Sequence, residues 1–162
     1  MTSRHAGIVA LGLTLFASAM DTRPRSSASS LVGTWRLVEF TDTVDGKVVH
    51  QFGDKPLGIF IYAPSGRMSI HVLHNPVPQR FDDLNLPGAE QDALEARSYI
   101  GYFGAYEVDV RRSMVTHRVE GGTRLSYIGI ARDRPFRIDG NRLTIGDDTT
   151  WRRVLERIPD RR

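Results

Sequence analysis

The chain has 162 residues, of which 40% are hydrophobic, so it can bury one sizeable core but not two, and we expect a single domain. Its net charge of +3 comes mainly from arginine, because Lys47 and Lys55 are the only lysines; the arginines are scattered among strands and turns, and we interpret them as solvated surface. Without a basic face carrying stacking aromatics, nucleic acid is excluded as an expected partner, and without cysteine, disulfides are excluded as a source of stability.

The first 19 residues have the pattern of a signal peptide. Arg4 supplies the positive start, Gly7 to Ala17 is an apolar run, and Ala17-Ser18-Ala19 is a small-x-small cleavage site. The apolar run is shorter than the roughly 20 residues that a membrane-spanning helix needs. We therefore expect export to the periplasm or the medium, without stable membrane insertion after cleavage. The polar, serine-rich residues 20–30 are expected to be a disordered lead-in.

Short β-type runs separated by tight turns fill the rest of the chain. Gly33-Thr34-Trp35 opens the first run, and Asp45-Gly46 is typical of a two-residue hairpin turn. Up to ten runs can be distinguished, at residues 34–40, 48–52, 58–63, 67–73, 102–109, 114–120, 124–131, 136–138, 142–145 and 149–158. Residues 74–88 contain three prolines and no periodicity, which predicts an irregular lid or rim loop.

Helical spacing occurs once, from Ala89 to about Tyr99, and Gly101 follows it. The whole pattern predicts a mainly β domain over residues 31–158. We expect a closed antiparallel up-and-down β-barrel of eight to ten strands, with one short α-helix capping an end. Closure removes unpaired strand edges and leaves an interior that holds either packed side chains or one small ligand.

The order and spacing of several short motifs resemble the bacterial and fungal lipocalin-like domain family, within the calycin group of ligand-holding barrels. The motifs are Leu31-Val32-Gly33-Thr34-Trp35, Gly58 to Tyr62 with Ser65 to Ser69, Tyr102 with Gly104-Ala105-Tyr106 and Asp109, Val115-Thr116-His117 with Val119-Glu120-Gly121, and Arg137 to Leu143. The resemblance implies a barrel with an internal cavity, and it implies no particular activity. It also implies that Gly33 and Trp35 lie at one end of the barrel, beneath a cation from the last strand, which here is Arg152 or Arg153.

Six residues are candidate ligand contacts: Ser69, His71, Tyr102, Tyr106, His117 and Tyr127. Ser69 and His71 share a strand face with Leu73, and His117 shares one with Val115 and Val119. If these faces point inward, they place a polar spot in an otherwise apolar pocket, where a histidine can orient a carbonyl or move a proton near neutral pH. The tyrosines offer rings and hydroxyls to the same ligand; the alternative for every one of them is an ordinary core or surface role.

Other site chemistries find little support. His71 and His74 are three apart and fall on opposite faces of a strand, and no cysteine is present, so no metal site is expected. The chain lacks a Gly-x-Ser-x-Gly elbow and a glycine-rich phosphate loop, so neither covalent catalysis nor a nucleotide cofactor is expected, and we assign no catalytic residue.

The sequence thus favours an exported barrel that holds a small hydrophobic or amphipathic molecule in its lumen. Two alternatives stay open. One is a cofactor-free isomerase or cyclase, in which His71, His117 or a tyrosine hydroxyl moves a proton on a small apolar substrate; it is favoured if His71 and His117 both reach the same cavity. The other is an envelope-associated interaction protein with a filled barrel and an exposed apolar patch.

Overall fold

The computed structural model describes residues 28–77 and 88–159. The expected signal peptide and most of the expected lead-in lie outside these ranges. Ala28–Leu31 form a one-turn helix, α1, so the last residues of the expected disordered lead-in are helical instead. No helix in the two ranges is both long enough and apolar enough to span a bilayer.

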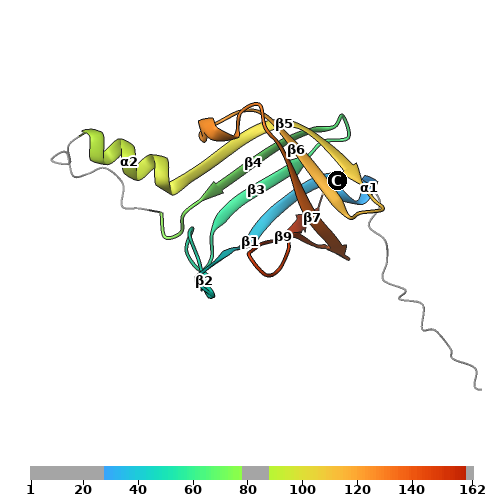
Figure 1. Ribbon diagram of the computed structural model, residues 1–162, viewed down its shortest axis with the longest axis horizontal. Helices are drawn as coiled ribbons and strands as arrows, with labels where there is room; N and C mark the ends of the chain where they lie inside the picture. The colour runs from blue at the N-terminus through green and yellow to red at the C-terminus, as the bar shows by residue number, and fades with distance from the viewer. Residues whose placement is uncertain (1–27, 78–87, 160–162) are drawn as a thin grey trace, which may run out of the picture.

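Within the described ranges, nine strands form one antiparallel sheet that closes on itself (Figure 1). Strands β3 to β9 follow one another in chain order, and β1 closes the barrel by pairing with both β3 and β9. Strand β2 lies outside the closed ring, against the far end of β1. The bounds are β1 Gly33–Val44, β2 Lys47–Val49, β3 Leu57–Tyr62, β4 Arg67–Leu73, β5 Tyr99–Asp109, β6 Met114–Gly122, β7 Ala131–Asp139, β8 Arg142–Gly146 and β9 Trp151–Ile158. The predicted closed up-and-down barrel of eight to ten strands is confirmed.

The hairpin between β1 and β2 forms for the reason that its sequence indicates. Asp45 and Gly46 have φ angles of 51° and 73°, the pair of positive values that a type I′ turn requires. Glycine adopts such an angle without a steric penalty, and aspartate tolerates it better than most residues. The turn matches the right-handed twist of the two strands that it joins.

The predicted helix is present as α2, Gly88–Ser98, and it leads directly into β5 at Tyr99. It stands at one end of the barrel and projects from it along the line of β5 (Figure 1). Of the irregular loop expected before it, residues 78–87 lie outside the described ranges.

The segment from Arg124 to Asp139 differs from expectation. Leu125–Tyr127 form a 3₁₀ turn, η1, where a strand was expected over residues 124–131, and β7 then runs unbroken through Pro135. Residues 131–135 pair with β6, whereas residues 136–139 pair with β8, so the chain passes from one neighbour to the other at the proline. Proline lacks an amide N–H, and this position in the ladder tolerates the loss.

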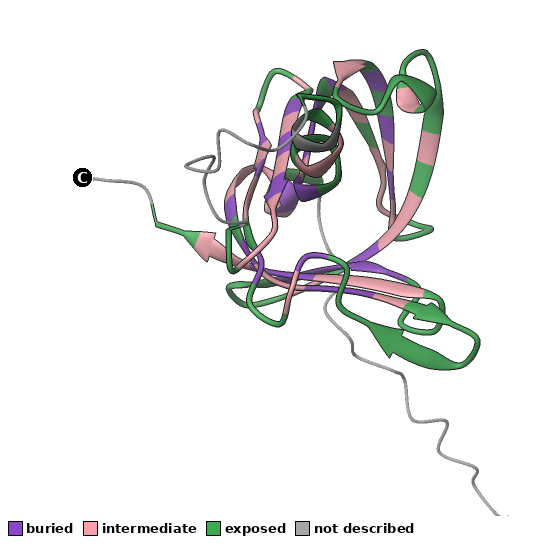
Figure 2. Cartoon of the chain, turned by 90° about the vertical axis from the view of Figure 1, so that its left-hand side faces the viewer, coloured by how far each residue is buried: buried purple, intermediate pink, exposed green. Residues whose placement is uncertain are grey.

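Alternation along each strand separates an inner from an outer face, as Figure 2 shows by burial. On β4 the inner residues are Met68, Ile70 and Val72, each at most 4% exposed. They meet inner residues of the neighbouring strands, such as Phe60 and Tyr102, which flank Ile70 in register. The core is therefore the barrel interior itself.

Trp35 fills one end of this interior. Its side chain is fully buried, and its indole N–H donates to the carbonyl of Leu31 at 2.9 Å. The cation over its ring is Arg157, 4.0 Å from the ring centroid, which corrects the expectation of Arg152 or Arg153. Gly33 makes room for it: φ is 139°, and a Cβ atom there would lie 2.4 Å from a terminal nitrogen of Arg157.

Candidate ligand site in the barrel lumen

A pocket of about 60 Å³ lies inside the barrel. One ordered water needs about 10–15 Å³ measured in this way, so the pocket has room for several waters or for one compact small molecule. Six of its eleven lining residues are apolar, and the polar side chains come from β5, β6, η1, β7 and β9. The lining residues are Phe40, Phe60, Ile70, Val72, Ile100, Ile145, Tyr102, His117, Tyr127, Arg134 and Arg153.

His117 is the buried polar centre of this site, with no exposed surface. Tyr62 Oη lies 2.9 Å from its Nε2 atom, and Tyr102 Oη lies 3.2 Å from its Nδ1 atom. Burial, reinforced by the positive charge of Arg134, holds the pKa of His117 well below its ordinary value. The imidazole is therefore neutral at physiological pH.

The two tyrosines on His117 remain protonated. Burial is the largest cause that raises the pKa of Tyr62 well above its ordinary value, and burial also raises the pKa of Tyr102. The charge of Arg134 acts in the opposite direction on both. The site thus combines a neutral imidazole with two neutral phenols and a guanidinium whose field reaches all three.

Three arginines carry positive charge into the interior, which corrects the interpretation of all arginines as solvated surface. Arg153 lies 3.3 Å from the ring centroid of Phe40, and it donates to a carboxylate oxygen of Asp42 at 2.7 Å. Arg132 lies over the Tyr127 ring at 4.1 Å, and Arg134 lies 5.3 Å from the centroid of Trp151. Burial lowers the pKa of Arg153, yet a guanidinium keeps its charge at any physiological pH.

Sequence reasoning missed Arg132 and Arg134, although a signal was present. Both lie an even number of residues before Phe136, which is 3% exposed, so the three share one strand face. Asp133 and Arg137 alternate with them on the outer face and are exposed. In a strand, whether an arginine faces inward or outward is therefore better predicted from its spacing to a core residue than from its charge.

The structure brings three of the six candidate ligand contacts together, since Tyr102, His117 and Tyr127 all line the pocket. Tyr106 also belongs to the inner face. Its ring packs edge-on against Tyr62 with centroids 5.1 Å apart, and its hydroxyl donates to the carbonyl of Ala63 at 2.9 Å. Tyr106 thus supports the wall behind His117.

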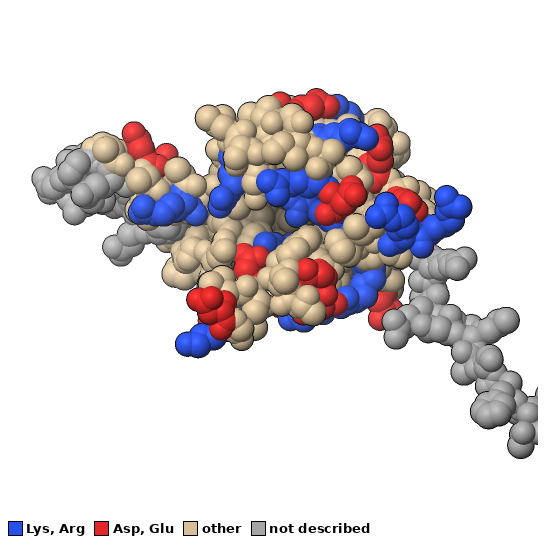
Figure 3. All heavy atoms as spheres, viewed as in Figure 1, with Lys and Arg blue, Asp and Glu red and all other residues tan. Residues whose placement is uncertain are grey.

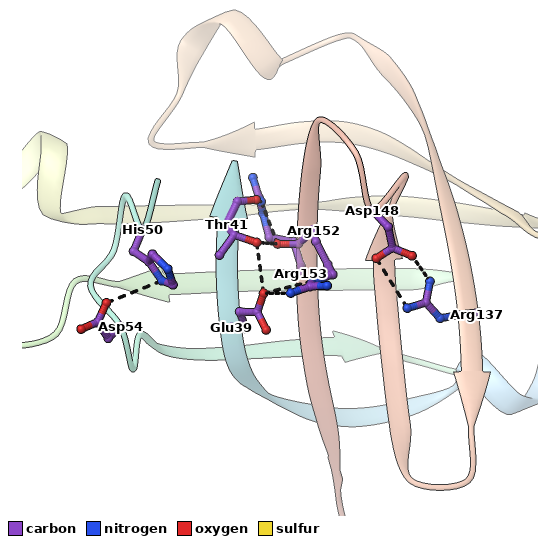
Figure 4. Close-up of polar contacts among 8 residues, drawn as sticks. All are labelled: Glu39, Thr41, His50, Asp54, Arg137, Asp148, Arg152 and Arg153. Atoms are coloured by element: carbon purple, nitrogen blue, oxygen red, sulfur yellow. Dashed lines mark hydrogen bonds and ion pairs between the residues drawn. The ribbon is translucent and has the colours of Figure 1, made fainter. Parts of the chain in front are cut away.

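Ser69 and His71 lie on the outer face of the barrel, not on the expected inner one. Ser69 Oγ is 2.8 Å from His71 Nε2, and the Nδ1 atom of His71 is 2.5 Å from Tyr99 Oη. The orientation follows from the neighbouring residues, because the alternate face with Ile70 is the more apolar and is buried. Arg152, named as a barrel-closing candidate, also faces outward and binds Glu39 (Figure 4).

A second hollow of about 370 Å³ lies at the end of the barrel that Trp35 fills, near Gly33, Tyr62 and Arg157. The guanidinium of Arg157 is already committed there, donating to the carbonyls of Val32 and Ser30 at 2.8 and 2.5 Å. This second hollow is larger than the lumen pocket, but it offers fewer uncommitted polar groups to bind a ligand.

The closed barrel and the pocket at its centre define a class of protein, the antiparallel barrels that bind small molecules in their interior. The chain belongs to the lipocalin-like domain family, whose sequence pattern matches residues 32–156, so the resemblance drawn from its motifs is confirmed. No curated protein matches the chain.

Proposed function

We propose that this protein is exported and that it binds a small amphipathic molecule in the barrel lumen. The observation that carries the proposal is the composition of the pocket: apolar walls from β1, β3, β4, β5 and β8 face a compact group of polar side chains around His117. Such a lining matches the common form of small-ligand sites, where apolar burial supplies affinity and a few polar groups fix orientation.

The export part of the proposal rests on the signal-peptide pattern of residues 1–19. Expression of the full chain in a bacterium, followed by fractionation and intact mass measurement, tests it. A mature species beginning near Met20 outside the cytoplasm is the expected result. A full-length cytoplasmic protein contradicts export and leaves the binding proposal untouched.

A pair of variants on adjacent positions of β4 tests binding in the lumen. Val72→Phe places a ring in the pocket, whereas Leu73→Phe adds the same group on the outer face. We expect the neutral dye N-phenyl-1-naphthylamine to bind the parent protein and Leu73→Phe, and to bind Val72→Phe at least about tenfold more weakly. Thermal unfolding of both variants shows whether the fold is retained, since overpacking costs about 1–3 kcal/mol. Equal binding by the two variants contradicts a luminal site.

The isomerase alternative loses one of its two candidate histidines, because His71 lies on the outer face of the barrel. His117 and Tyr102 still share the pocket, but none of the described residues adds a second histidine to it. The filled-barrel alternative is less favoured because the lumen retains a cavity, although Leu57 and Phe103 are about half exposed on the outer face. Ligand carriage is the function that the described residues support best.

A further inference from the structure

Arg132 and Arg134 differ from Arg153 in lacking an anionic partner. Arg153 binds Asp42, whereas no carboxylate of the described ranges forms an ion pair with Arg132 or Arg134. The Nε atoms of both residues are buried without any hydrogen-bond partner. Both side chains are half-buried, and a guanidinium with a buried, unbonded N–H is unfavourable, so two of them on one strand face favour binding of an anion.

Aromatic rings compensate these two charges only in part. Arg132 lies over Tyr127 and Arg134 lies near the ring of Trp151. An aromatic ring attracts the cation through its face, but it accepts no hydrogen bonds from the in-plane N–H groups of the guanidinium. Those N–H groups are the ones that bind a carboxylate bidentately. The donors of Arg134 therefore still lack an acceptor at the pocket wall.

The hydrogen bonds of His117 indicate where Tyr102 directs its proton. A neutral imidazole has one N–H and one bare nitrogen, so one tyrosine donates to it and the other accepts from it. The Tyr62 side chain is fully buried, and among the described residues its hydroxyl has a single hydrogen-bond partner, the Nε2 atom of His117. The O–H of Tyr62 must therefore donate to Nε2, because no other acceptor is available to it. This assigns the N–H to Nδ1, which donates to Tyr102. The O–H of Tyr102 is thereby free to donate into the pocket that its ring lines.

The polar lining of the pocket thus supplies mainly donors. Arg134 and the hydroxyls of Tyr102 and Tyr127 offer N–H and O–H groups, both nitrogens of His117 are engaged, and no carboxylate is among the described residues that line the pocket. A lining of this kind matches a group that only accepts hydrogen bonds and carries negative charge. Figure 3 shows both basic and acidic atoms around a hollow on one face of the molecule.

We propose that the ligand is a compact monocarboxylic acid, and that its carboxylate binds Arg134 and the hydroxyl of Tyr102 while its apolar part lies against the aliphatic wall at Ile70 and Ile145. Arg132 adds positive charge from the same face of β7. This inference rests on the proposed function, because it names the ligand chemistry of the same pocket.

Three probes with one tail test the inference on the full mature chain: octanoate, 1-octanol and octylamine, titrated by calorimetry at pH 7. We expect octanoate to bind at least about tenfold more tightly than 1-octanol, and octylamine to bind most weakly, because a charge-assisted pair is roughly twice as strong as a neutral hydrogen bond. The preference for the acid should fall as ionic strength rises.

Arg134→Gln should abolish the preference for octanoate and leave the affinity for 1-octanol within about twofold. Arg137→Gln is the matched control, because Arg137 lies on the same strand but faces outward, where it pairs with Asp148 (Figure 4). Arg134→Lys should retain part of the preference, since the charge remains and the fork is lost.

The outcomes separate this inference from the proposed function. If octanoate and 1-octanol bind equally, or if Arg134→Gln and Arg137→Gln behave alike, the carboxylate inference is overturned while luminal binding stands. If N-phenyl-1-naphthylamine and all three octyl probes fail to bind the parent protein, both fail together.

Discussion

Trp35 and Arg157 are direct register partners across the β1–β9 pair that closes the barrel. The guanidinium covers the indole, and its terminal nitrogens donate to the carbonyls of Ser30, within α1, and of Val32, just after it. One side-chain pair thus joins the first strand, the last strand and the segment that precedes the barrel. Closure of the sheet and closure of this end of the lumen are consequently coupled.

This coupling predicts a large effect of Arg157→Ala on stability. The substitution removes the cation from a fully buried ring and leaves two carbonyls without their donor, so we expect the free energy of unfolding to fall by about 2–3 kcal/mol. Arg152→Ala, at a position on β9 that faces outward, removes a half-exposed pair with Glu39 and should cost about 0–1 kcal/mol. Urea denaturation of both variants measures the difference, and equal losses contradict the closing role of Arg157.

Acid should weaken the fold through His117. In the unfolded chain this histidine binds a proton below its ordinary pKa of 6.5, whereas burial keeps it neutral in the native state. Its contribution is thus fully present above pH 6.5 and is lost as the pH falls toward the depressed native pKa, with a slope approaching about 1.4 kcal/mol per pH unit. His117→Gln should flatten this part of the profile of unfolding free energy between pH 7.5 and 4.5. An unchanged slope contradicts the assignment to His117.

The two tyrosines on His117 should differ when truncated. Tyr62→Phe leaves the bare Nε2 atom of a buried histidine without a donor, and we expect a loss of about 1–3 kcal/mol of unfolding free energy. Tyr102→Phe removes an acceptor that also faces the pocket, where water can replace it, so the loss should be smaller by about 1 kcal/mol. Chemical denaturation of the two variants compares them directly. The reverse order contradicts the tautomer with its proton on Nδ1.

Arg134→Met should raise stability at the expense of anion binding. The side chain of methionine is similarly long and apolar, and it relieves an unpaired charge whose field also acts on Arg153 and His117. We expect the unfolding free energy to rise by about 1 kcal/mol, because residues that form a binding site often lower the stability of the free protein. Arg137→Met, on the outer face of the same strand, serves as control. A fall in the midpoint of thermal unfolding for Arg134→Met alone would mean that Arg134 has a structural partner in the free protein.

The outer cluster of Ser69, His71 and Tyr99 should play no part in luminal binding. The Ser69→Ala, His71→Ala double variant removes two of the six sequence-predicted ligand contacts without touching the pocket. We expect its affinity for N-phenyl-1-naphthylamine to stay within about twofold of the parent protein in a fluorescence titration. A loss of about tenfold or more would restore the ligand-binding role predicted from sequence.

Much of the fold could be predicted from turn residues and alternation. Asp45-Gly46 marks its hairpin because few other residue pairs tolerate two positive φ angles, and the helix of α2 is visible because its spacing differs from that of a strand. The errors lie where local signals compete. Pro135 indicated a break, yet the ladder changes partner at that residue and the strand continues.

The candidate site was only partly predictable. Tyr102, His117 and Tyr127 were found because each is polar among strand residues, whereas Arg132 and Arg134 were taken for surface by charge alone. Likewise, alternation grouped Ser69 with His71 correctly and placed the pair on the wrong face. An alternating pattern defines two faces but not which of them points inward.

By itself, the sequence determined where apolar and polar residues alternate and where the chain turns, because these features depend on residues close together in the chain. Its composition, which lacks cysteine, excluded disulfide bonds. Only the closed sheet decided which face turned inward, which arginine covers Trp35, and that Arg134, which has no ion pair among the described residues, lines the same pocket as a neutral histidine. Those relationships join residues up to about 120 positions apart, as Trp35 and Arg157 are, and they exist only once total burial has selected one register for all the strands together.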